Sequence, residues 1–181
     1  LLLVVFLLIG FTVNSQQDRQ NLEVDFLDVG QGDAILIKTP YEQNILIDGG
    51  PDNKVLSELG KNLAFFDKKI DLLVLTHPHS DHVTGLVEVL RRYQVKKILM
   101  TGVLHTAPDY LAFLDEINKQ KIPVDLVNGI KDINLGRDLT LKILYPLKNI
   151  SQQKFEELND TSIVLKLVYK NNSFLFMGDA E

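Results

Sequence analysis

The stretch Thr76 to Gly85, THPHSDHVTG, holds most of the histidine in this chain. The sequence has 181 residues and four histidines, and three of the four, His77, His79 and His82, lie within six positions that also include Asp81. In an extended segment His77 and His79 point to the same side, with Cα atoms about 6.6 Å apart, so both imidazoles can reach one cation. Asp81 and His82 follow where a strand turns into a helix, and they can face a second cation. A bound divalent ion keeps such crowded imidazoles neutral, so the stretch predicts a metal site.

Composition bounds the kind of protein and the kind of metal site. The chain is 45% hydrophobic and 24% charged, which is typical of one globular domain with a sizeable core. Its net charge of −5 gives no overall basic character that would hold a polyanion. The absence of cysteine excludes disulfides and thiolate ligands, so imidazole and carboxylate groups must hold any metal.

The N-terminal residues 1–13, LLLVVFLLIGFTV, form an apolar run. A bilayer-spanning helix needs about 20 apolar residues, and a signal peptide begins with a basic region. Three interpretations remain open: the end of a transmembrane helix, the core of a signal segment, or a buried strand or helix. Residues 14–21 are predicted to be a linker, and they lack the Lys/Arg excess of a cytoplasmic flank. We therefore expect a membrane-anchored domain on the extracytoplasmic side.

Residues 22–181 are predicted to form the folded domain. Alternating apolar residues and glycine-rich turns indicate strands at 22–29, 33–39, 43–50, 69–76, 95–101, 122–127, 138–146, 161–170 and 172–181. The first three resemble an antiparallel meander. Helical spacing predicts helices over 53–63, 83–93 and 107–120. The pattern predicts an α/β fold of mixed sheets with helices on the outer faces.

The histidine stretch resembles the H-x-H-x-D-H signature of metallo-β-lactamase fold hydrolases at all four ligand positions, His77, His79, Asp81 and His82. Asp48 in ILIDGG resembles the family's early aspartate, and Asp179 in FLFMGDAE resembles its late Gly-Asp turn. More narrowly, FLDVGQGDAILIKT, NDTSIVLKL and FLFMGDAE are similar to the extracellular domain of ComEC/Rec2 competence proteins, which are membrane proteins of bacterial DNA uptake. The resemblance covers residues 22–181.

The resemblance implies a metallo-β-lactamase-like αββα sandwich that holds two divalent ions, Zn²⁺ or Mn²⁺. His77 and His79 would hold one ion and Asp81 and His82 the other, with Asp179 between them. Asp48 would orient a ligating imidazole. The catalytic residues implied are Asp81 and Asp48.

The chain also departs from the family pattern. His105 is the candidate for the family's further histidine ligand, and a loop histidine is the alternative. The usual position of that ligand reads NDTS, so Asn159, Asp160 and Ser162 are candidates for binding substrate, unless they only form a polar turn. Asp33 and Gln31 could line the site or shape the GQGDA turn. The family's last histidine lies beyond the Gly-Asp turn, so the domain is expected to be C-terminally truncated.

The resemblance implies a metal-dependent phosphodiesterase or nuclease that acts on DNA during competence-type uptake. Its expected partners are DNA, a membrane through the N-terminal apolar segment, and a competence channel domain of the same or a neighbouring chain. The alternatives are a small-molecule hydrolase of the same fold, acting on a lactone or phosphoester, and an inactive DNA-binding or channel-associated module. Basic stretches at 68–69 and 91–97 could contact DNA or only form solvated surface.

Overall fold

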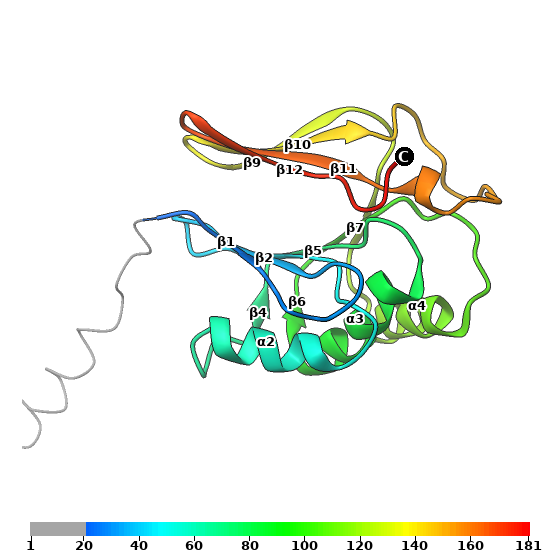
Figure 1. Cartoon of the computed structure of the whole chain (residues 1–181), viewed down its shortest axis with the longest axis horizontal. Helices are drawn as coiled ribbons and strands as arrows, with labels where there is room; N and C mark the ends of the chain where they lie inside the picture. The colour runs from blue at the N-terminus through cyan, green and yellow to red at the C-terminus, as the bar shows by residue number, and fades with distance from the viewer. Residues whose placement is uncertain (1–20) are drawn as a thin grey trace, which may run out of the picture.

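The computed structural model describes residues 21–181 as two packed β-sheets with helices on one side (Figure 1). The first sheet has six strands in the order β1-β2-β3-β5-β7-β8, and the second has four in the order β12-β11-β10-β9. The apolar run 1–13 and the predicted linker, except residue 21, lie outside the described residues. Within the described part, no helix is long and apolar enough to cross a membrane.

The six-stranded sheet combines an antiparallel part and a parallel part. Its strands are β1 (Glu23–Phe26), β2 (Ile35–Lys38), β3 (Asn44–Ile47), β5 (Leu72–Val74), β7 (Ile98–Met100) and β8 (Val124–Leu126). The first three pair antiparallel, which confirms the predicted meander, and β3, β5, β7 and β8 run parallel. Parallel neighbours need long crossovers. These contain α2 (Lys54–Asn62), α3 (Ser80–Arg92) and α4 (Pro108–Gln120).

The four-stranded sheet is antiparallel throughout. It contains β9 (Lys131–Gly136), β10 (Leu139–Tyr145), β11 (Val164–Tyr169) and β12 (Asn172–Phe176). The sequence analysis did not predict β9, because KDINLG is largely polar and ends in glycine. The predicted strand 69–76 was also partly wrong: its start, β4 (Lys69–Ile70), pairs with β6 (Gln94–Val95) in a separate two-stranded sheet.

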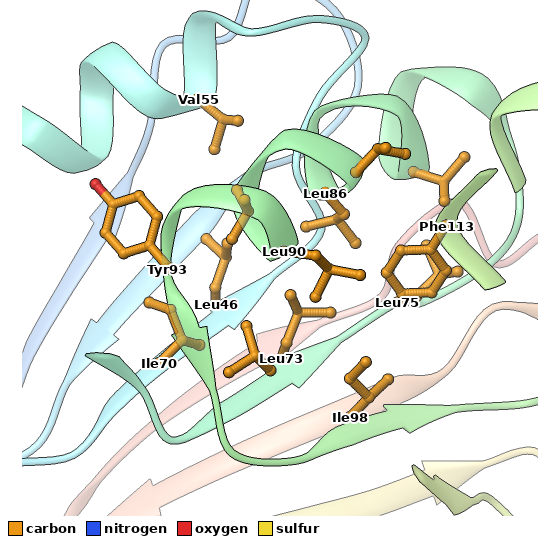
Figure 2. Close-up of a cluster of buried hydrophobic side chains, with 14 of the residues drawn as sticks. Leu46, Val55, Ile70, Leu73, Leu75, Leu86, Leu90, Tyr93, Ile98 and Phe113 are labelled. Carbon is orange, nitrogen blue, oxygen red and sulfur yellow. The ribbon is translucent and has the colours of Figure 1, made fainter. Parts of the chain in front are cut away.

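The six-stranded sheet is apolar on both faces, and alternate residues enter two different cores. On β3, Leu46 packs in the helix-side core, whereas Ile45 and Ile47 pack against the four-stranded sheet. Figure 2 shows the helix-side core, where Leu86 and Leu90 of α3 lie over Leu46 and Leu73 of the sheet. Continuous apolar runs such as ILI therefore mark strands that are buried on both sides.

The helices lie over one outer face of the sandwich (Figure 1). The second core lies between the two sheets, where Leu141, Ile143, Leu165 and Leu167 face β2 and β3. Within residues 21–181 no α-helix covers the outer face of the four-stranded sheet (Figure 1). The predicted α/β sandwich of mixed sheets is confirmed, and within residues 21–181 its helices lie on one outer face, whereas the predicted αββα arrangement has them on both.

Helix α3 begins three residues earlier than predicted, at Ser80 instead of residue 83. His79 is its N-cap in an extended conformation, and its carbonyl accepts hydrogen bonds from the backbone N–H groups of His82 and Val83. Asp81 therefore lies in the first turn of the helix, where a negative charge interacts favourably with the helix dipole.

Candidate metal centre

Asp48, at the end of β3, is the buried anchor of the site. Its side chain is fully buried, and its backbone is left-handed with a φ of 55°. The double-glycine turn begins at the next residue. Oδ1 accepts the backbone N–H of Thr76 at 2.8 Å, and Oδ2 accepts the Thr76 hydroxyl at 2.6 Å. Oδ2 also lies 2.9 Å from Nδ1 of His82. One carboxylate thus joins the end of β5 to the first turn of α3.

This network fixes the orientation of two imidazoles. The Asp48 carboxylate is an acceptor, so the Nδ1–H of His82 donates to it and leaves the lone pair on Nε2. Thr76 has one hydroxyl proton, which goes to Asp48, so its oxygen can only accept from Nδ1 of His77 at 3.1 Å. His77 therefore also has its lone pair on Nε2. In neutral rings held this way, a metal ion would bind the two Nε2 lone pairs, of which that of His77 faces Nδ1 of His79 at 2.9 Å.

The predicted metal ligands lie together at the junction of β5, α3 and the turn after β12. Nε2 of His77 lies 2.9 Å from Nδ1 of His79. The two Asp179 oxygens lie 3.8 Å from Nε2 of His77 and 3.4 Å from Nε2 of His82. Oδ1 of Asp81 lies 3.9 Å from Nε2 of His82. Asp179 is thus placed between the two histidine positions.

One buried polar atom in this cluster has no hydrogen-bond partner within the described part of the chain. Nε2 of His82 is buried and forms no hydrogen bond. A buried polar atom without a partner costs about 1–3 kcal/mol, so such atoms need an explanation. Three imidazoles and two carboxylates supply the nitrogen and oxygen ligands that suit a divalent cation. These residues therefore fit the metal that the family resemblance implies.

The electrostatics of the site differ between its histidines. Burial and the neighbouring charges of His82 and His79 lower the pKa of His77 to about 3. Burial also opposes protonation of His82, but its hydrogen bond to Asp48 and the charges of Asp48 and Asp179 raise its pKa to about 9. Carboxylates thus make the His82 position attractive to positive charge.

Asp179 reaches the site in a tight turn that follows β12 of the four-stranded sheet. Gly178 has a φ of +52°, and a Cβ there would lie 2.9 Å from Oγ1 of Thr76. Ser162 is fully buried, and its hydroxyl oxygen accepts the backbone N–H of Asp179 at 3.3 Å. In this structure Ser162 supports the Asp179 turn, and its predicted contact with substrate stays a prediction.

The remaining candidates from the sequence are Asn159, Asp160 and His105. Asn159, in the short 3₁₀ helix η1 (Asn159–Thr161), donates to Glu181 at 3.1 Å, and its Oδ1 is buried without a partner in the described residues. Asp160 is exposed beside a hollow that Tyr145, Met177 and Ala180 also line. His105 packs near the Tyr110 ring. It belongs to neither of the two clusters of possible metal-binding atoms found in the described residues, which are His77, His82 and Asp179, and Asp33, Asp48 and His82.

Thr76 and Gly32 gave no signal of their own in the sequence analysis, whereas Gln31 and Asp33 were candidates to line the site. Thr76 precedes the histidines, and its hydroxyl role could have been suspected only from that position. Gln31 donates to Oδ2 of Asp81 at 3.1 Å from the β1–β2 loop. Gly32 lies against the Asp81 backbone, where a Cβ would be 1.8 Å from the carbonyl oxygen. Asp33, next in the loop, is partly buried close to His82.

Comparisons with known proteins show the family to which the chain belongs. Residues 27–181 match the model of the Metallo-beta-lactamase superfamily. The chain is 26% identical to ComE operon protein 3 of Bacillus subtilis (strain 168), over 98% of this chain and 24% of that protein. It is 25% identical to ribonuclease Z of Aeropyrum pernix, over 51% of this chain and 32% of that protein. The chain therefore spans about a quarter of the length of ComE operon protein 3 and about a third of the length of ribonuclease Z.

A solved structure shares the fold. A metallo-beta-lactamase from Cronobacter sakazakii with a mutated HARLDQ motif superposes with a TM-score of 0.55. The match covers 84% of this chain and 60% of that chain at 15% identity. At this identity the likeness shows the architecture alone.

Proposed function

This chain belongs to the metallo-beta-lactamase superfamily of hydrolases, and we propose that it is a metal-dependent phosphodiesterase that cleaves DNA during competence-type uptake. The observation that carries the proposal is the cluster of His77, His82 and Asp179. His79 lies against His77, and Asp81 and Asp179 lie 3.9 and 3.4 Å from the buried Nε2 of His82, which forms no hydrogen bond. A degenerate, metal-free module would have no reason to keep this atom unpaired.

Each residue of the centre has a defined task. His77 and His79 would hold one ion, and Asp81 and His82 would hold the other. Asp179 lies between both positions. Asp48 and Thr76 keep the two imidazole lone pairs directed into the centre. Two divalent ions bound there would polarise a phosphodiester and acidify an attacking water. The nitrogen and oxygen ligands suit Zn²⁺ or Mn²⁺.

The choice of a nucleic-acid substrate rests on similarity. The relatives include a protein named ribonuclease Z, which favours phosphodiester chemistry, and ComE operon protein 3, which aligns with almost the whole chain. The basic stretch 91–97 adds little support. Arg91 pairs with Glu88 and Glu116, and Lys97 pairs with Asp125. Arg91 also lies at the opposite end of α3 from the centre. DNA would therefore be recognised mainly through its phosphates at the metal centre.

The surroundings of the domain are also proposed from the resemblance. We propose that residues 1–13 anchor the chain in a membrane, and that the domain works outside the cytoplasm beside a competence channel domain. This orientation is tested by fusing a reporter enzyme to the chain after residue 181. The reporter is one that is active only outside the cytoplasm. Reporter activity is expected on the extracytoplasmic side, and activity restricted to a cytoplasmic reporter would reject the proposal.

The central experiment measures metal content and DNA cleavage together. The purified chain is expected to bind two Zn²⁺ or Mn²⁺ ions and to cleave linear DNA. His79→Ala and Asp81→Ala should each lose bound metal and reduce cleavage at least 100-fold, since each removes a ligand of one ion. His105→Ala replaces the histidine outside the cluster and should keep both ions.

Two results would reject the proposal. The first is a chain that binds no metal, or one whose cleavage is unchanged in both ligand variants. The second is a metal-loaded chain that hydrolyses a lactone or a small phosphoester and leaves DNA intact, which would favour the small-molecule alternative.

A further inference from the structure

The loop between β1 and β2 brings a third aspartate to the metal centre. Gly32 packs so closely on the Asp81 carbonyl that any side chain there would overlap it. Gln31 donates to the Asp81 carboxylate, and the Asp33 carbonyl accepts the backbone N–H of Gly50 at 2.9 Å. Residues 31–33 of the loop are therefore held against the elements that carry Asp81 and Asp48.

The side chain of Asp33 lies within reach of His82, the imidazole whose buried Nε2 forms no hydrogen bond. A carboxylate oxygen of Asp33, one of Asp48 and a ring nitrogen of His82 all lie within 4.8 Å of one another. Asp48 is already engaged with Nδ1 of His82 and with Thr76. Asp33, in contrast, receives no side-chain hydrogen bond and no Lys or Arg ion pair from the residues that the structure describes.

The Asp33 carboxyl group also interacts electrostatically with Asp81 and Asp179. Burial raises the pKa of its carboxyl group, and the charges of Asp179 and Asp81 add to this effect, while His82 opposes it. Within residues 21–181 no lysine or arginine pairs with Asp33, Asp81 or Asp179. Three carboxylates thus gather around His82 without a lysine or arginine of the described residues to offset them, although Gln31 keeps Asp81 in place.

We propose that Asp33 is a further metal ligand, which completes the coordination of the ion held by Asp81 and His82. This inference rests on the proposed metal centre. The second position then has one imidazole and three carboxylates, Asp33, Asp81 and Asp179, whereas the first has two imidazoles and Asp179. Oxygen-rich sets suit harder ions such as Mn²⁺, and imidazole suits Zn²⁺. The two positions therefore differ in metal preference, and the second takes Mn²⁺.

The test counts bound Mn²⁺ without relying on enzyme activity. The full chain, purified in detergent and stripped of metal, is titrated with Mn²⁺, and the free ion is followed by its electron paramagnetic resonance signal. The wild-type chain is expected to bind two ions. Asp33→Asn should keep one and bind the second at least tenfold more weakly, because an amide oxygen carries no charge.

A matched control lies in the same loop. Asp28 is exposed and pairs with Lys54, so Asp28→Asn should bind both ions like the wild type. Circular dichroism checks that Asp33→Asn is folded, and Asp33→Glu, which keeps the charge, should bind the second ion more tightly than Asp33→Asn. Two ions bound by Asp33→Asn with wild-type affinity would overturn the role of Asp33. A wild-type chain that binds no ion would instead overturn the metal centre itself.

Discussion

Replacing Gly32 by alanine tests whether the β1–β2 loop is part of the metal centre. Gly32 and Gly30 both have left-handed φ angles, +67° and +91°, so alanine at either position costs roughly 1–2 kcal/mol in backbone strain. Only Gly32 has no room. Its Cβ would lie 1.8 Å from the Asp81 carbonyl oxygen, whereas a Cβ at Gly30 meets nothing within 4 Å.

The structure gives the size of the difference between the two variants. Ordinary Cβ contacts are not shorter than 3.0 Å, so the loop or the start of α3 must move by about 1.2 Å, the difference between 3.0 and 1.8 Å. Overpacking of this kind costs about 1–3 kcal/mol. Gly32→Ala should therefore lower the free energy of unfolding by roughly 2–5 kcal/mol, and Gly30→Ala by roughly 1–2 kcal/mol.

The assay is urea unfolding of both metal-free variants, followed by calorimetric titration with Zn²⁺. Because metal ligands must be held within about 0.5 Å, a displaced Asp81 should weaken metal binding at least tenfold in Gly32→Ala. Gly30→Ala should bind metal like the wild type. If the two alanine variants unfold at the same urea concentration and bind Zn²⁺ equally, the close packing of this loop on Asp81 is refuted.

Three further predictions concern packing, charge and hydrogen bonding. Gly85→Ala places a Cβ 1.9 Å from the Gly49 carbonyl oxygen and should destabilise the fold by about 1–3 kcal/mol in urea unfolding. Gly60→Ala, with free space in α2, should instead stabilise it by about 0.5–1 kcal/mol; a stabilising Gly85→Ala would contradict the packing. Burial opposes ionisation of Asp71, but hydrogen bonds led by that from Lys69 hold its pKa below the usual value. Its stabilisation is therefore present above about pH 4 and lost as the pH falls through the lowered pKa. Asp71→Asn should be about 1–2 kcal/mol less stable at pH 7, with the gap closing in acid unfolding curves; a gap independent of pH would contradict this. Thr76→Val removes the hydroxyl between Asp48 and His77 and should weaken Zn²⁺ binding about 10–100-fold by calorimetry, and unchanged affinity would count against that hydroxyl.

The local features of the site were predictable because they are encoded in short stretches. The spacing of His77, His79, Asp81 and His82 needs only a strand that ends where a helix begins, and the apolar run before it predicts the strand. Asp48 was also expected beside an imidazole, and it accepts a hydrogen bond from His82. These inferences depend on neighbours in sequence and on one resemblance.

The features that could not be predicted depend on contacts between distant segments. The approach of Gly32 to Asp81 joins positions 49 residues apart, and nothing in GQGDA alone specifies its partner. Strand β9 forms because its backbone pairs with β10, in spite of a polar sequence. Similarly, the start of α3 at Ser80 follows from the N-cap geometry of His79, which apolar spacing does not report.

The proposed metal donors come from both halves of the sandwich. The histidines and Asp81 follow β5 of the six-stranded sheet, whereas Asp179 follows β12 of the four-stranded sheet, and a single backbone hydrogen bond from Ile163 to Thr76 also joins the halves there. A bound ion would therefore act as a cross-link over this seam. Removing it with a chelator should speed amide hydrogen exchange in β11 and β12 before it affects β3 and β5, so the metal would determine whether the domain opens in one step or in two.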